Sequence, residues 1–184
     1  MYGLINSALK SMINEQFSAD TWEKILAVSN VPNESFMTMR SYDDQITYDL
    51  LGAASEVLAL PADKCLELFG EYWVLESAPR EYGSLLDACG ANFIEFMSNL
   101  NTLHDRITTT FLDYRPPEFC CEEREGHHTV IYRSPREGLV PFVVGLLKGL
   151  ATRFNCELNI LGIEKIATER GTEAEIKITI SSRD

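Results

Sequence analysis

The chain has 184 residues, of which 45% are hydrophobic and 24% charged, a composition typical of a single soluble domain with a substantial core. Its 28 acidic residues outnumber 16 basic ones and give a net charge of -12, so nucleic acid and anionic lipid would be repelled. The longest apolar run, residues 139–147, contains a proline and a glycine and is far shorter than the roughly 20 residues of a membrane span. We therefore predict no nucleic acid and no membrane among the partners.

Apolar residues recur at intervals of three and four through the first two thirds of the chain, which predicts a series of helices. The opening stretch "MYGLINSALKSMINEQF" has this periodicity and lacks the continuous apolar segment of a secretory signal. Proline and glycine residues delimit several of the helices. The first predicted helix begins near Leu4, and the second runs from Asp20-Thr21 to Pro32-Asn33. The others span residues 43–60, ended by Pro61, and 61–77, followed by 82–90, closed by Gly90, and 92–111, which is stopped by Arg115-Pro116-Pro117.

After Pro117 the pattern changes to strands around one helix. Ile176, Ile178 and Ile180 alternate with polar residues, as expected for a half-buried strand. We predict an α+β fold, with a helical front part and a β-α-β-β back part whose strands form a small antiparallel sheet. The predicted elements are a strand at 128–134, a helix at 139–154, and strands at 156–169 and 173–182 joined at Arg170-Gly171.

Five cysteines, an odd number without a CxxC spacing, suit a reducing compartment better than a disulfide framework, so we predict a cytoplasmic protein. The adjacent pair Cys120 and Cys121 is followed closely by His127 and His128, and these side chains together resemble a metal ligand set. Their spacing matches no zinc pattern. We interpret the segment as a polar loop with scattered thiols.

A histidine lies in an apolar stripe of the long predicted helix. Met97, Leu100, His104, Ile107 and Phe111 are spaced three, four, three and four residues apart, which places them on one helical face. A histidine in such a stripe is more often a hydrogen-bonded core residue than a ligand. An imidazole in an apolar wall is also what a haem iron requires, because the neutral ring nitrogen donates to the metal.

The stretch "IYRSPR", residues 131–136, places three polar side chains among apolar neighbours. In an extended chain Tyr132, Ser134 and Arg136 lie on one face, over about 13 Å at ~3.3 Å per residue. Two hydroxyls and a guanidinium are the donors that a pair of buried carboxylates needs, and a haem carries such a pair. A solvated face of an edge strand explains the triplet equally well.

The sequence resembles the H-NOX family, the haem nitric oxide/oxygen binding domains that also form the sensor region of soluble guanylate cyclase. The resemblance runs nearly end to end. It covers "MYGLINSAL", "FGEYWV", "EFMSNLNTLHDRI" around His104, "RPPEF" and "YRSPREGLVPFVVGLLKGL". The Tyr-x-Ser-x-Arg signature is specific when it lies about 28 residues beyond an inward histidine, as it does here.

The resemblance implies a single H-NOX domain, residues 1–184, that binds haem b (Fe protoporphyrin IX) between two lobes. Residues 1–60 would form a distal helical lobe packed on a proximal lobe, residues 61–184, of helices and the sheet. His104 would be the axial iron ligand, and Pro117 would press on the porphyrin. Tyr132, Ser134 and Arg136 would hold the propionates. The remaining haem neighbours would be Tyr2, Leu4, Ile5, Trp73, Met97, Leu100, Leu103 and Phe142.

The resemblance also carries an expectation about the gas. Family members that hold O2 use a distal tyrosine, and Phe142 stands at that place if the segment is aligned on Gly145. Phenylalanine donates no hydrogen bond, so we expect NO and CO to bind and O2 to be excluded. Tyr2 and Trp73 are alternative donors, although both are equally well explained as core aromatics.

The implied activity is signalling without catalysis. NO would weaken the bond between iron and His104, the helix would shift, and the lobes would rotate, changing the surface offered to a partner. Moving such a switch takes ~5 kcal/mol of differential binding. The partner would be a histidine kinase, a diguanylate cyclase or a guanylate cyclase region.

Four alternatives stay open from the sequence. The first is a sensor of the same fold that binds O2. A haem peroxidase or oxygenase would need a distal acid-base group, and the predicted distal lobe has no histidine. The third is a haem-free module that senses oxidants through Cys120 and Cys121. The last is a plain α+β ligand-binding domain with a core histidine.

Overall fold

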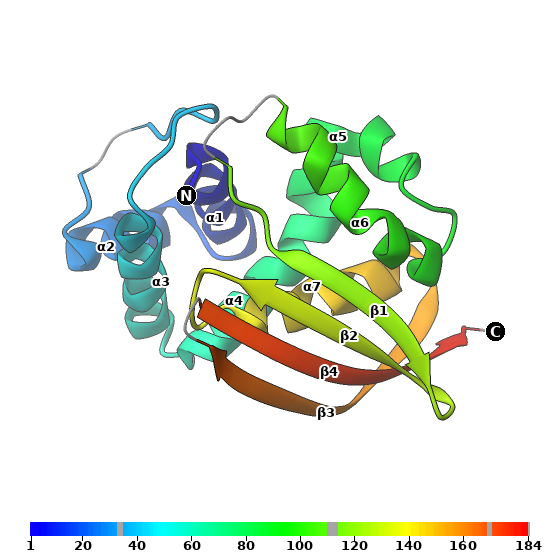
Figure 1. Ribbon diagram of the computed structural model, residues 1–184. Helices are drawn as coiled ribbons and strands as arrows, with labels where there is room; N and C mark the ends of the chain where they lie inside the picture. Colours follow the sequence, from blue (N-terminus) through cyan, green and yellow to red (C-terminus); the bar gives the residue numbers. More distant parts are fainter. Residues whose placement is uncertain (33–34, 110–113, 169–170, 184) are drawn as a thin grey trace.

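The computed structural model describes the chain except for residues 33–34, 110–113, 169–170 and 184 (Figure 1). The predicted α+β class is confirmed, because a helical amino-terminal part is followed by a small antiparallel sheet. The helices are α1 (Gly3–Gln16), α2 (Ala19–Ser29), α3 (Asp44–Leu58), α4 (Ala62–Tyr72), the π-helix η1 (Trp73–Ser77), α5 (Ala78–Asp87), α6 (Phe93–Thr108) and α7 (Val140–Arg153). The strands are β1 (Glu118–Arg124), β2 (His127–Ser134), β3 (Cys156–Thr168) and β4 (Gly171–Ser182).

Local side-chain chemistry sets the bounds of α2. The Ser18 hydroxyl accepts a hydrogen bond from the Thr21 amide at 3.2 Å, so the helix is capped two residues before the expected start at Asp20. Asn30 adopts the left-handed conformation that ends the helix before Pro32. Asn33, expected to help close the helix, lies outside the described residues.

The predicted helix at 61–77 is not a single α-helix. It changes at Trp73 into the five-residue π-helix η1, and α5 follows directly at Ala78 instead of beginning near residue 82. A π-turn accommodates one extra residue, so apolar periodicity gives no warning of it.

The sheet has the strand order β1-β2-β4-β3, with every neighbouring pair antiparallel. Strand β1 was missed, because "EFCCEER" was interpreted as a polar loop and only Phe119 in it is buried. An edge strand exposes one side and so tolerates such polarity. Glu125 and Gly126, both with positive φ, form the tight turn to β2, and the glycine there was the available signal.

Cys120 and Cys121 are adjacent on β1 and therefore point to opposite faces of the sheet. His127 and His128, adjacent on β2, do the same, so the four side chains do not share one face. Within the described residues there is no group of three or more His, Cys, Asp or Glu side chains arranged to hold a metal ion. The described helices are also too short or too polar to cross a membrane.

Two apolar cores lie side by side. Residues such as Leu9, Trp22 and Leu50 form the first core within α1–α4, and Met97 and Ile176 belong to the second, formed by α5–α7 and one face of the sheet. Figure 1 shows α1–α3 on one side of the molecule, the sheet on the other, and α4 and α7 between them. We call these the amino-terminal core and the carboxy-terminal core.

Helices α4 and α7 cross closely where the two cores meet. A Cβ atom added at Gly70 would collide with the Phe142 carbonyl, and one added at Gly145 would collide with the Glu67 carbonyl. Only glycine allows the two backbones to approach this closely. The crossing places Phe142 beside Phe69, with ring centroids 5.2 Å apart.

Candidate functional site

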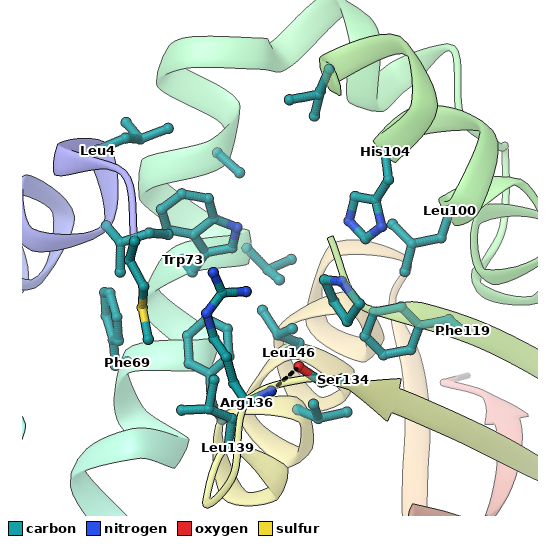
Figure 2. Close-up of a pocket in the computed structure, with 18 of the residues that line it drawn as sticks. Leu4, Phe69, Trp73, Leu100, His104, Phe119, Ser134, Arg136, Leu139 and Leu146 are labelled. Atoms are coloured by element: carbon teal, nitrogen blue, oxygen red, sulfur yellow. Dashed lines mark hydrogen bonds between the residues drawn. The ribbon is translucent and has the colours of Figure 1, made fainter. Parts of the chain in front are cut away.

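A cavity of about 480 Å³ lies where the amino-terminal and carboxy-terminal cores meet, and apolar side chains dominate its lining (Figure 2). The lining comes from the start of α1, from α3 to α7 with η1, and from β1 and β2. All residues that the sequence placed around a haem line this one cavity. They are Tyr2, Leu4, Ile5, Trp73, Met97, Leu100, Leu103, His104, Pro117, Tyr132, Ser134, Arg136 and Phe142.

His104 projects from α6 into the cavity, as Figure 2 shows. Its Nδ1 atom is buried and has no hydrogen-bond partner among the described residues. Burial lowers the pKa of His104, against smaller opposing effects of the Pro117 carbonyl and Asp105, so the ring is neutral at pH 7. A core histidine would normally satisfy both ring nitrogens, so the unpaired Nδ1 atom favours the ligand interpretation.

The predicted stripe on α6 is present in part. Met97 is buried and Leu100 and Ile107 are half-buried against the carboxy-terminal core, whereas Phe111 lies outside the described residues. Asn101 fixes the helix to β1 with two hydrogen bonds to the Phe119 backbone, of 2.7 and 3.0 Å. This clamp, which the sequence did not reveal, sets where the imidazole lies.

Tyr114 connects the imidazole to the start of the chain. Its ring lies edge-on to His104 and edge-on to Tyr2, with centroids 6.3 Å apart in both pairs. Burial raises the pKa of Tyr114 to about 12, so its hydroxyl stays protonated. The sequence gave no signal for this residue, because it lies in an irregular segment.

The row of three polar side chains exists only in part. Tyr132 and Ser134 share the inner face of β2 and are 2% and 7% exposed. Arg136 is not on the strand, because β2 ends at Ser134 and Pro135, which has no amide proton, cannot extend the ladder. The prediction of one continuous strand face was therefore wrong for Arg136, which reaches the cavity from the following bend.

Three hydrogen bonds hold Arg136 at the cavity edge. Its amide donates to the Ser134 hydroxyl at 3.1 Å, and its guanidinium donates to Asp44 at 2.8 Å and to the Arg115 carbonyl at 3.0 Å. A guanidinium has five donors, so further N–H groups remain for a carboxylate in the cavity. The side chain is only 19% exposed, which strengthens any such bond.

Asp44, at the start of α3, is a site residue that sequence reasoning missed. Its carboxylate accepts from Arg136 and from the amino group of Met1. Burial alone would raise the pKa of Asp44, but these two cations outweigh it and hold the pKa below its usual value. In the sequence, Asp44 was indistinguishable from an ordinary helix-start acid.

The wall opposite His104 is aromatic. Phe69, Trp73 and Phe142 line it, with Trp73 edge-on to Phe69 at 6.5 Å between centroids. Phe142 offers no hydrogen-bond donor. Figure 2 shows the indole nitrogen of Trp73 directed toward the interior of the cavity.

The model of a protein family described as haem-NO-binding matches residues 2–161, which include every predicted site residue. The chain belongs to this family. Members of the H-NOX family, as it is also known, are sensor domains that bind haem. The neutral His104 ring, with its unpaired Nδ1 atom, and the Arg136 donors at the cavity edge fit such a group.

Solved H-NOX structures share the fold over the whole chain. The unliganded Fe(II) protein from K. algicida is 24% identical, with a TM-score of 0.82 over 100% of this chain and 98% of that one. The Fe(II)NO protein from S. oneidensis is 17% identical, with a TM-score of 0.83 over 99% and 100%. An oxygen complex of an H-NOX domain is 15% identical, with a TM-score of 0.83 over 99% and 96%.

Curated relatives are soluble guanylate cyclases. The gcy-31 protein of Caenorhabditis elegans is 28% identical over 152 residues, which is 82% of this chain and 22% of that protein. The 89Da protein of Drosophila melanogaster is 25% identical over 182 residues, 97% of this chain and 27% of that protein. The chain therefore spans about a quarter of the length of these relatives.

Proposed function

We propose that the protein is a haem-based gas sensor that binds NO and CO at a ferrous haem b and passes the signal to a partner protein. The observation that carries this proposal is the buried, neutral imidazole of His104, whose Nδ1 atom has no hydrogen-bond partner among the described residues, in a large apolar cavity. When bound, haem would supply an iron atom that takes a diatomic gas. The surrounding side chains would hold the haem and exclude water from it.

Each site residue has a separate task in this proposal. His104 provides the axial nitrogen, while Tyr132, Ser134 and Arg136 hold the carboxylates at the cavity edge. Pro117 lies in the cavity wall next to His104 and is positioned to restrain the porphyrin. The apolar remainder excludes water and so strengthens these polar contacts.

The preference for NO over O2 is proposed from one wall of the cavity. Phe142 occupies the place expected for an oxygen-stabilising tyrosine, and it packs on Phe69 without offering a donor. NO and CO depend less on such a donor than O2 does. The surface of this wall is therefore suited to NO and CO.

Signalling would use the junction of the two lobes proposed for residues 1–60 and 61–184. Arg136 and Asp44 join these regions through an ion pair at 2.8 Å at the edge of the cavity. A movement of α6 that displaces His104 would reach Tyr2 through Tyr114. The partner would be a histidine kinase, a diguanylate cyclase or a guanylate cyclase region, in the cytoplasm.

The thiol-sensor alternative finds little support in the cysteine environments. Burial raises the pKa of Cys121 to about 11, and burial also raises the pKa of Cys65, Cys89 and Cys156. A redox-sensing cysteine needs the opposite shift, because the thiolate is the reactive form. Cys120 is the exposed member of the group, and it is a single site.

An absorption spectrum tests the proposed function. The purified protein, reduced without air, is expected to show a ferrous haem spectrum that shifts on adding NO and, separately, CO. A haem titration of the haem-free protein should saturate at one equivalent. A protein that stays colourless, or that takes up haem without any saturation, would contradict the proposal.

A further inference from the structure

A second hollow lies on the outer face of the sheet, at the turn between β1 and β2. Figure 1 shows this turn at the end of the sheet far from α1–α3. Val130 and Ile176 alternate along β2 and β4 with residues of the hollow and belong to the carboxy-terminal core, so the sheet separates the hollow from the cavity of His104. The lining of this outer hollow consists of Arg124, Glu125, His127, Thr129, Glu175 and Lys177.

Two buried polar atoms of the outer hollow lack a hydrogen-bond partner within the described residues. Thr129 is 0% exposed and its hydroxyl is unpaired, and the Nε2 atom of His127 is also buried and unpaired. Such atoms are rare in folded proteins, because an unpaired buried polar group costs free energy. The Nδ1 atom of His104 in the first cavity has the same property. Unpaired atoms that line a hollow indicate a ligand that pairs with them.

The size of the outer hollow decides between a water molecule and a larger ligand. Its volume is about 450 Å³. A water molecule takes up roughly 30 Å³. One ordered water would satisfy a hydroxyl and an imidazole but would fill only a small part of this space. The hollow therefore has room for a small organic molecule.

The charges of the lining select the class of molecule. Glu122 pairs with Arg124 through nitrogen–oxygen distances of 3.0 and 2.5 Å, and Glu175 lies 4.0 Å from the same guanidinium. Lys177 has no carboxylate within 4.0 Å among the described residues, although the chain has 28 acidic residues. The outer hollow thus presents an unpaired positive charge beside the negative charge of Glu175.

Other classes of ligand fit this lining less well. A plain anion would face Glu125 and Glu175, and a metal cation would face Lys177. In the described part of the chain, no three His, Cys, Asp or Glu side chains are arranged to hold a metal ion. A neutral sugar would leave Lys177 unpaired. A zwitterion satisfies both signs of charge, because its carboxylate accepts from cations and its ammonium group donates to carboxylates.

We propose that the outer hollow binds a small zwitterion of the α-amino acid class. The carboxylate of the ligand accepts hydrogen bonds from the Thr129 hydroxyl, from Lys177 and from His127, whose ring can carry a proton on Nε2. The ammonium group of the ligand donates to Glu175. This site lies across the sheet from His104, so it does not depend on haem.

Calorimetric titration of the purified protein with each of the common L-amino acids tests the proposal. We expect at least one of them to bind with a stoichiometry of one. Its N-acetyl derivative, which lacks the positive charge, and its amide, which lacks the carboxylate, should each bind at least about tenfold more weakly. Equal binding of either derivative, or no binding of any amino acid, would overturn the proposal.

Thr129→Val replaces the unpaired hydroxyl by a methyl group and is the test variant. It should weaken binding of the amino acid at least about tenfold and raise the Tm of the ligand-free protein, because it removes an unpaired buried polar group. A folding defect would instead lower the Tm. Thr172→Val, near the other end of β4 and outside the hollow, is the control and should bind as the parent does. Unchanged binding by Thr129→Val would overturn the proposal.

A map of the binding site on the unsubstituted protein covers the case in which the variants do not fold. In ¹⁵N-labelled protein the bound amino acid should shift the amide resonances of residues 127–129 and 175–177 and leave those of residues 103–105 unchanged. Shifts confined to residues 103–105 would place the ligand in the cavity of His104 and overturn the proposal.

Discussion

The two cores contribute differently to the cavity between them. The carboxy-terminal core supplies His104 and the Tyr132, Ser134 and Arg136 donors, so it carries the groups that would anchor a cofactor. The amino-terminal half supplies apolar surface and the carboxylate of Asp44, which is partly exposed at the cavity edge and pairs with Arg136. In the proposed function, the carboxy-terminal half would therefore hold the cofactor and the amino-terminal half would shape the space around it.

His104→Gly tests the anchoring half and has the largest expected effect. We expect loss of haem on purification, and recovery of the haem spectrum when free imidazole is added to fill the vacated space. His128→Ala, which alters a histidine outside the cavity, should retain haem. Haem retention by His104→Gly without imidazole would show that another residue binds the iron.

Gly145→Ala tests the junction between the halves. The added methyl group would collide with the Glu67 carbonyl, so we expect a loss of about 1–3 kcal/mol in the free energy of unfolding. Gly52→Ala is the matched control, because nothing lies within 4 Å of a Cβ there and α3 should gain roughly 0.5–1 kcal/mol. Urea unfolding of the two variants should thus move in opposite directions, and parallel shifts would contradict the close crossing.

Arg136→Gln tests the cavity edge. Removing the charge-assisted donor should speed haem loss to an acceptor protein about tenfold or more. Arg133→Gln, on the outer face of β2 and paired with Glu173 at 2.8 Å, should leave the rate unchanged. Equal effects of both substitutions would mean that Arg136 acts only through general charge.

Asp44→Asn has the smallest expected effect, and it tests the ion pair that the amino-terminal half makes at the cavity edge. Because the folded-state pKa of Asp44 is lowered, its ion pairs stabilise the protein above the unfolded pKa and are lost as pH falls through the folded pKa. The difference in Tm between the parent and Asp44→Asn should therefore be present at pH 7 and shrink toward pH 3. Asp49→Asn, at an exposed position of the same helix, is the control and should change the Tm less at pH 7.

The anchoring groups were predictable because each is tied to a repeating local pattern. His104 follows from helical periodicity, and Tyr132 and Ser134 follow from strand alternation. The resemblance to H-NOX domains then connected them. Arg136 was assigned to the right site through the wrong geometry, since alternation does not continue past Pro135.

Other features depend on contacts between segments far apart in the sequence. Asp44 meets Arg136 across 92 positions, and Asn101 clamps the backbone at Phe119 across an irregular segment. Strand β1 lacks the apolar alternation from which a strand is predicted, because it is an edge strand. The π-helix at Trp73–Ser77 could not be predicted either, because a single π-turn does not interrupt the apolar periodicity.

Resonance Raman spectroscopy of the reduced protein without any gas tests the central claim most directly, because it detects the bond between iron and an imidazole. We predict an iron–histidine stretching band in the parent protein, unchanged in His128→Ala and absent in His104→Gly before imidazole is added. A parent spectrum with no such band, or a band that persists unaltered in His104→Gly, would contradict the account.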